Sequence, residues 1–164
     1  MLSPTFLKQD KIEKCILNTV KKQKQIVYGG RSIQKQIGIF SRPTTDFDIF
    51  TSNPKSNAYA MEKKLDKIMG FDYFYKKKGM NKSTWKVKNK GKDMKKGTQD
   101  DEGVVDYTQT PKPKPKVKKI NGVYYRNIKE ELKAKRCALK DKEMSFRHKK
   151  DLEDIHRIKL GGKK

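Results

Sequence analysis

The chain has 164 residues, of which 33% are hydrophobic and 37% are charged, so we expect one small domain with a modest core. Its 42 Lys and Arg residues against 19 Asp and Glu give a net charge of +23, which favours polyanionic partners and nucleic acid above all, although a lysine-rich proteome would give the same excess. The composition excludes a membrane partner, a secretory signal and a disulfide or zinc framework, because no apolar run nears the roughly 20 residues that span a bilayer and the two cysteines lie far apart. We therefore expect a cytoplasmic protein, or one carried in a virus particle.

The first part of the chain predicts two helices around a short strand. Apolar residues recur with helical spacing over 5–22, and the β-branched and aromatic run Gln25–Tyr28 indicates a strand. Gly29-Gly30 ends this strand in a tight turn, and a second helical pattern covers 31–39. The inward positions of that second helix are predicted to be Ile33, Ile37 and Ile39.

The next segment alternates acidic and apolar residues. After a loop over 41–45, Asp46 and Asp48 fall on one face of a strand that ends at Phe50, because successive side chains of a strand point to opposite faces. Asn53-Pro54 breaks the strand. A helix is then expected over 57–69, capped by Ser56 and ended by Gly70.

The middle of the chain predicts short strands separated by basic loops. Phe71–Tyr75 and Thr84–Val87 form a hairpin, and a mobile loop follows over 88–103. Residues 104–108 form a strand in which Asp106 is the lone acidic residue. The Pro-Lys tract over 111–116 is expected to be extended and polyproline-like, because alternating prolines exclude a helix and cannot donate to a sheet.

Two helices are predicted at the end of the chain. The first runs over 127–140 and the second over 146–160, where Gly161-Gly162 ends it. The order of elements indicates an α/β (α+β) fold, a small mixed sheet flanked by helices. The predicted organisation is a core over 1–110, a spacer over 111–119 and C-terminal helices over 120–164 that pack on the core. The inward positions of the two helices are predicted to be Ile128, Leu132 and Leu139, and Leu152, Ile155 and Ile158.

Three features of the sequence point to chemistry. Gly29-Gly30-Arg31-Ser32 stands where a strand becomes a helix, and the start of a helix offers backbone N–H groups to a phosphate. Asp46 and Asp48 present hard oxygen ligands that suit Mg²⁺ or Mn²⁺, and Asp106 can supply a third carboxylate. Two metal ions held in this way would polarise an α-phosphate and activate a hydroxyl. Taken singly, each feature also fits a plain turn, an exposed strand face or a solvated residue.

Gly29-Gly30-Arg31-Ser32 followed by Asp46-Phe47-Asp48 resembles the pattern of the nucleotidyltransferase superfamily. Within that superfamily the chain is most similar to the minimal nucleotidyltransferases of the abortive-infection toxin type. The resemblance spans most of the chain and implies a polymerase β-like fold with a C-terminal helical pair. Two departures stand out, since residues 31–45 make a longer spacing than usual and the 88–103 loop and the Pro-Lys tract resemble insertions. The resemblance also includes Ile120–Val123, Leu132–Lys135, Arg147, Lys149–Leu152 and Asp154-Ile155.

The resemblance implies a role for each site residue. Asp46, Asp48 and Asp106 would be catalytic and bind Mg²⁺ or Mn²⁺, with Asp106 acting as the base for the incoming hydroxyl. Gly30 and Ser32 would contact the triphosphate. The nucleotide-binding set implied in this way is Gly29, Gly30, Arg31, Ser32, Lys135 near the phosphates, and Lys150 with Asp151, which would form the pocket or brace the helices.

The expected function is metal-dependent transfer of a nucleoside monophosphate from an NTP to a hydroxyl acceptor, and the charge favours an RNA 3′ end such as that of tRNA. An antidote protein or a larger assembly is a further possible partner. One alternative is a non-enzymatic basic protein that binds nucleic acid or builds a structure, such as a virion component, and retains the fold. Another is a protein-modifying transferase. His148 and His156 are expected to face solvent, and Trp85, Tyr73 and Tyr75 either stack on bases or, as we favour, pack in the protein.

Overall fold

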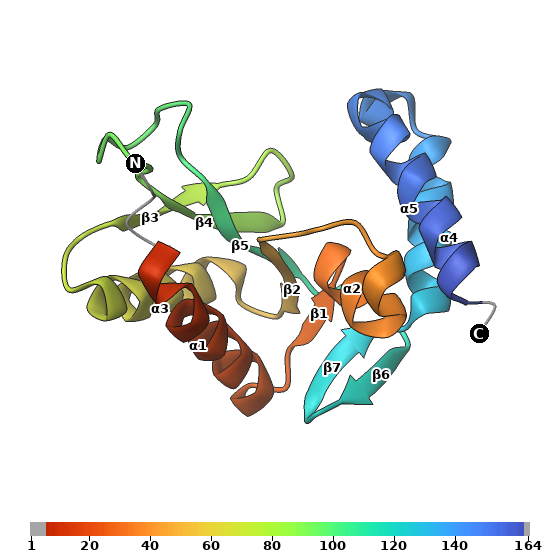
Figure 1. Cartoon of the computed structure of the whole chain (residues 1–164), viewed down its shortest axis with the longest axis horizontal. Coiled ribbons are helices and arrows are strands. Elements are labelled where there is room, and N and C mark those ends of the chain that lie inside the picture. Colours follow the sequence, from red (N-terminus) through yellow and green to blue (C-terminus); the bar gives the residue numbers. More distant parts are fainter. Residues whose placement is uncertain (1–5, 163–164) are drawn as a thin grey trace.

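The computed structural model describes residues 6–162 and forms one mixed sheet with helices on either side (Figure 1). The helices are α1 (Gln9–Lys22), α2 (Gly30–Ile37), α3 (Pro54–Met69), α4 (Ile128–Leu139) and α5 (His148–Gly161). The strands are β1 (Ile26–Tyr28), β2 (Phe47–Thr51), β3 (Phe74–Lys78), β4 (Thr84–Asn89), β5 (Gly103–Gln109), β6 (Val117–Ile120) and β7 (Val123–Arg126). None of the helices in this part of the chain is long and apolar enough to cross a membrane.

The seven strands follow the order β3-β4-β5-β2-β1-β7-β6. The pairs β2–β5 and β1–β7 are parallel, whereas the other neighbours are antiparallel. This order places β2 and β5 side by side at the centre of the sheet. The predicted α/β fold with a small mixed sheet flanked by helices is therefore confirmed.

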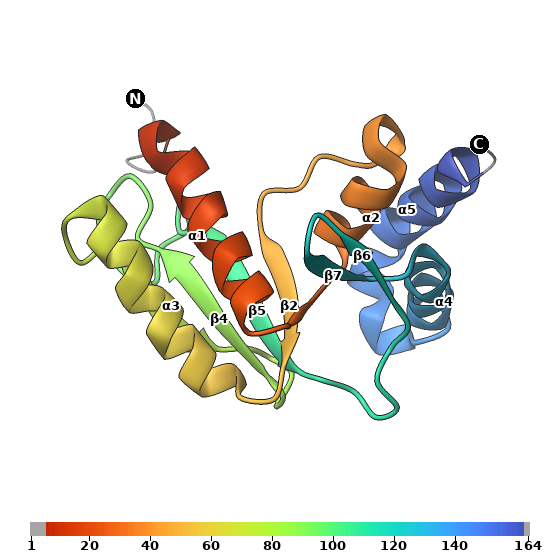
Figure 2. The ribbon, with the colours of Figure 1, turned by 90° about the horizontal axis from the view of Figure 1, so that it is seen from below.

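One face of the sheet carries the main core. Phe47 and Ile49 of β2 and Val105 and Tyr107 of β5 point to this face, where they pack with apolar side chains of α1 and α3. Figure 2 shows α1 and α3 together on their side of the sheet, with α2, α4 and α5 gathered beyond β1 and β7. A smaller core joins α2 to α5 through Ile33, Ile37 and Ile158. Because strand side chains alternate, the polar residues of β2 and β5 point to the opposite face.

A hairpin that the prediction missed follows the Pro-Lys tract. Strands β6 and β7 pair across Asn121-Gly122, and both turn residues have positive φ (51° and 82°), as a tight two-residue hairpin turn requires. Strand β7 then pairs in parallel with β1. The segment after the spacer therefore supplies two strands of the sheet as well as two helices, and β6 begins inside the range assigned to the spacer.

Several details of the helices differ from the prediction. Helix α2 ends at Ile37, and Gly38 with a φ of 59° turns the chain so that Ile39 is 89% exposed instead of inward. Leu152 is also 57% exposed, because the neighbouring Asp151 takes the inward position on α5. Phe146 is exposed in a short 3-10 helix before α5. The first α-helix begins at Gln9, after a 3-10 helix over Phe6–Lys8, and residue 5 of the predicted range lies outside the described residues.

The aromatic residues and histidines of the middle and end of the chain also have defined places. Tyr73 and Tyr75 are buried and Trp85 packs against the main core, so the packing interpretation holds for all three. His156 is exposed, as expected. His148 is half-buried, and its Nε2 lies 3.0 Å from the carbonyl oxygens of Ala138 and Asp141, so the prediction that it faces solvent was wrong.

Candidate active site

The structure brings Asp46, Asp48 and Asp106 together, and we call these three residues the carboxylate trio. Parallel pairing of β2 and β5 sets Asp48 directly beside Asp106, and Asp46 lies just before β2 begins. One carboxylate oxygen from each residue lies within 4.8 Å of the others. All three side chains are half-buried and share the face of the sheet opposite α1 and α3. The convergence inferred from the sequence is thus present in the structure.

The trio carries more negative charge than its surroundings neutralise. Burial, followed by the charges of Asp46 and Asp106, raises the pKa of Asp48 to about 7. Burial also raises the pKa of Asp106. The ammonium of Lys86, 3.0 Å from Oδ2 of Asp106, partly offsets this rise. Closely spaced carboxylate oxygens are the ligands that Mg²⁺ and Mn²⁺ prefer. The donor set and its excess charge therefore fit a divalent cation.

Gly29 forms a bend directly against the trio. Its φ of 70° and ψ of −146° define a backbone conformation that residues other than glycine rarely adopt. A Cβ at this position would also collide with the carboxylate of Asp48. The N–H of Gly29 donates to Oε1 of Glu131 at 2.8 Å, which ties the bend to α4. The need for glycine here is thus both conformational and steric.

Gly30 begins α2 and approaches the loop that leads to Asp46. A Cβ on Gly30 would lie 2.9 Å from the hydroxyl oxygen of Thr44. The same hydroxyl donates to Oδ1 of Asp46 at 3.3 Å. Thr44 therefore connects the start of α2 with the trio, and sequence analysis did not identify it.

Arg31 and Ser32 make contacts with other parts of the protein. The Arg31 guanidinium pairs with Glu13 at 2.8 Å, donates to the carbonyl oxygen of Asp46 at 3.3 Å and lies 4.2 Å above the Phe47 ring. Ser32 is buried and its hydroxyl donates to the carbonyl oxygen of Arg126 at 2.6 Å. These contacts brace the walls of the site. Direct binding of a nucleotide by Arg31 or Ser32 stays a prediction.

Lys135 and Asp151 belong to a buried charged cluster between α4 and α5. The Lys135 ammonium lies 3.3 Å from Oδ1 of Asp151 and 3.1 Å from Oδ2 of Asp154, and Arg42 pairs with Asp154 at 2.8 Å. The charge of Lys135 reaches Asp48 and opposes the rise of its pKa. Asp151 thus braces the helices, whereas Lys150 is exposed on α5, and the structure does not bring it into this cluster. Their nucleotide contacts remain predictions.

Glu131 and Arg126 support the site, and sequence reasoning did not identify either. Glu131 is fully buried and accepts two hydrogen bonds of 2.8 Å from Arg126 in addition to the Gly29 N–H. The Arg126 guanidinium also lies over the rings of Tyr28 and Phe50, which stack 3.7 Å apart. A lone Glu in a helix start gives no signal of such contacts. Lys86 was missed likewise, because only the strand register places it beside Asp106.

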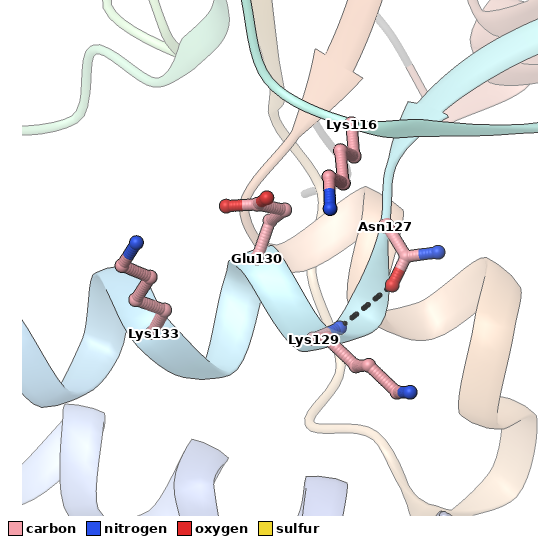
Figure 3. A pocket seen from close by; sticks show the side chains of 5 residues that line it. All are labelled: Lys116, Asn127, Lys129, Glu130 and Lys133. Carbon is pink, nitrogen blue, oxygen red and sulfur yellow. Dashed lines mark hydrogen bonds between the residues drawn. The ribbon is translucent and has the colours of Figure 1, made fainter.

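A basic pocket of about 380 Å³ lies where the chain enters β6 and α4 (Figure 3). The side chain of Asn127 caps α4 by accepting the Lys129 N–H at 2.9 Å. Three of its five lining residues are lysines and one is a glutamate, so the pocket carries a net positive charge. Its lining residues are Lys116, Asn127, Lys129, Glu130 and Lys133.

Comparison with solved structures gives the fold. The Megavirus polyadenylate synthase matches 94% of the chain with a TM-score of 0.73 at 15% sequence identity, and JHP933 from Helicobacter pylori matches 92% with a TM-score of 0.59 at 18% identity. The matched regions cover 32% and 64% of those two proteins. No protein-family model and no curated protein matches the sequence. The chain therefore shares the fold of these two proteins, while membership of the nucleotidyltransferase superfamily and of its toxin type remains a prediction.

Proposed function

We propose that this protein transfers a nucleoside monophosphate from an NTP to a hydroxyl group and releases pyrophosphate, with the carboxylate trio as its catalytic centre. The observation that carries the proposal is the convergence of three carboxylates within 4.8 Å beside a glycine bend. In-line displacement at a phosphate needs mainly positioning and neutralisation of charge. A carboxylate cluster next to the start of a helix supplies both requirements in one place.

Divalent metal ions fit the trio, and Asp46, Asp48 and Asp106 would hold them. Bound there, Mg²⁺ or Mn²⁺ would supply Lewis-acid polarisation of the phosphate and the hydroxyl. The raised pKa of Asp48 supports this assignment, because a bound cation would remove the repulsion that raises it. The proposal therefore includes a requirement of the activity for added divalent metal ion.

Groups of the protein itself would accept the proton and bind the triphosphate. The carboxylate of Asp106 lies at the edge of the trio next to β4 and would accept the proton of the attacking hydroxyl. Burial raises its pKa and thus its basicity. The backbone N–H groups at the start of α2 would hold the triphosphate, and Gly30 gives that phosphate close access. Lys135 would add positive charge behind the site.

An RNA 3′ end, such as that of tRNA, is the acceptor that we propose. The net charge of +23 supports a polyanionic acceptor over a protein or a small molecule. The fold is shared with a polyadenylate synthase, although at 15% identity the likeness concerns the fold alone.

The test is an incorporation assay with purified protein, Mg²⁺, each labelled NTP and RNA. We expect label to enter RNA, and Asp46→Ala or Asp48→Ala to abolish the signal. Asp93→Ala is the matched control, because Asp93 belongs to a separate acidic cluster in the 90–102 loop. Failure of every NTP, with RNA binding unchanged in the trio variants, would contradict the enzymatic proposal and favour the non-enzymatic alternative.

A further inference from the structure

The strand register places a row of charged side chains across the sheet. Lys77 of β3 pairs with Lys86 of β4, Lys86 pairs with Asp106 of β5, and Asp106 pairs with Asp48 of β2. Paired residues point to the same face, so all of these side chains share the face that carries the trio. Neighbouring strands lie about 4.8 Å apart, and β4 lies between β3 and β5. The backbone of Lys77 is therefore roughly 10 Å from that of Asp106.

Lys88 extends this row along β4. It lies two residues after Lys86 and therefore on the same face, and its charge lowers the pKa of Asp106. Among residues 6–162, Lys86 pairs with Asp106, whereas Lys77 and Lys88 make no ion pair. Lys76, on the other face of β3, pairs with Glu62 of α3. Lys77 and Lys88 thus carry positive charge on the face of the trio without a direct carboxylate partner among the described residues.

The trio lies between the lysines of β3 and β4 and the nucleotide side of the site. Gly29 and the start of α2 follow β1, whereas the lysines lie on β3 and β4, and β5 and β2 with the trio stand between them. By the proposed function, the triphosphate lies on the Gly29 side and the hydroxyl approaches Asp106. The acceptor must then reach Asp106 from the side where the unpaired lysines lie.

We propose that Lys77 and Lys88, with Lys86 next to them, bind the sugar-phosphate backbone of the acceptor strand and lead its 3′ end to Asp106. This inference rests on the proposed function for the direction of approach. Ammonium groups bind phosphates as point charges and carry no base preference, so the surface should be tolerant of sequence. Release of counterions would make the binding strongly dependent on salt.

The test measures fluorescence anisotropy of a labelled single-stranded RNA of roughly 12 nucleotides, a length that suits one small domain. Full-length protein is used without NTP or divalent metal ion, so that binding is measured apart from catalysis. Lys77→Ala/Lys88→Ala is compared with Lys11→Ala/Lys14→Ala. This control removes the same charge from exposed positions of α1, the helix that packs on the opposite face of the sheet. Lys86 is left intact because it contacts Asp106.

We expect the Lys77→Ala/Lys88→Ala variant to weaken RNA binding roughly tenfold at about 0.1 M salt, and to reduce the slope of log K against log salt by about 1.4, or 0.7 for each lost phosphate contact. The α1 variant should change binding less than about twofold. Equal losses in the two variants would overturn the proposal. So would competition by polyglutamate as strong as that by unlabelled RNA of equal charge, which would indicate an acidic protein partner.

A second measurement separates this inference from the proposed function. In the incorporation assay, the Lys77→Ala/Lys88→Ala variant should raise the KM for RNA and leave the KM for the NTP unchanged. If no NTP is incorporated but the difference in RNA binding is seen, the transferase proposal is wrong and the nucleic-acid surface is retained. If transfer occurs but the two variants bind RNA alike, the surface is wrong and the transferase proposal stands.

Discussion

Two clusters of buried charge lie close together in this protein and differ in their balance. The carboxylate trio has three carboxylates and one directly paired ammonium, that of Lys86. The cluster between α4 and α5 has two carboxylates, Asp151 and Asp154, which pair with Lys135, Arg42 and Arg147. The pKa of Asp48 in the first cluster is raised, whereas the hydrogen bond from Arg42 and the charge of Lys135 outweigh burial and lower the pKa of Asp154 in the second.

This difference in charge balance distinguishes a candidate binding site, the trio, from a cluster that holds α4 and α5 together. Buried carboxylates that the protein pairs with its own cations need no ligand to compensate their charge. Buried carboxylates left in excess destabilise the fold and are retained where a ligand completes them. The resemblance places Lys135 near the phosphates and leaves Asp151 to form the pocket or to brace the helices, and the ion pair between the two residues joins α4 to α5.

The largest expected effect is loss of transfer on the isosteric change Asp48→Asn. We expect the rate of incorporation to fall by at least about 100- to 1,000-fold, because the change removes charge where charge must be neutralised. The same variant should be more stable by roughly 1 to 3 kcal/mol in urea unfolding without metal ion, because it removes a repelled, desolvated carboxylate. A less stable Asp48→Asn protein would contradict our view of the trio.

The same isosteric change in the second cluster should have the opposite effect on stability. Asp154→Asn leaves Arg42 without its carboxylate partner and leaves Lys135 with Asp151 alone, so we expect a loss of about 3 kcal/mol in the free energy of unfolding. Urea unfolding measures it. Glu153→Gln is the control, because Glu153 is exposed and pairs only with Arg157 on the same helix, and its effect should stay below about 0.5 kcal/mol. Equal losses in the two variants would show that the second cluster is no brace.

The smallest expected effect is a pH dependence of opposite sign in the two clusters. Since the pKa of Asp48 rises from 3.8 to about 7 on folding, the folded state binds its proton more tightly, and the metal-free protein should lose roughly 1 to 3 kcal/mol as pH rises from about 4 to 7. The lowered pKa of Asp154 stabilises the fold above its ordinary value of 3.8, and this stability is lost as pH falls through the lowered value.

Urea unfolding at pH 4.5 and 7.5 measures the first of these effects. The decline should be shallower in the Asp48→Asn variant, and Mg²⁺ should reduce it in the unsubstituted protein by binding the folded state. Parallel pH profiles for the two proteins would show that Asp48 does not titrate in this range.

Local patterns in the sequence were enough to place the centre of the site. Alternation put Asp46 and Asp48 on one strand face, and the strand around Asp106 was recognised as a neighbour. The partners of these residues were beyond reach, because Lys86 and Glu131 meet the site only through strand register and helix packing. The hairpin of β6 and β7 was not predicted because β6 has few apolar residues, although Asn-Gly at 121–122 is a typical hairpin turn.

The hydrogen bond from Gly29 to Glu131 joins residues 102 positions apart. A chain leaving the ribosome therefore exposes all three aspartates before it has the carboxylate that anchors the bend. Because a domain generally folds as a unit, the bend gains its anchor only after α4 has been synthesised, and the candidate site is completed by the C-terminal part of the chain.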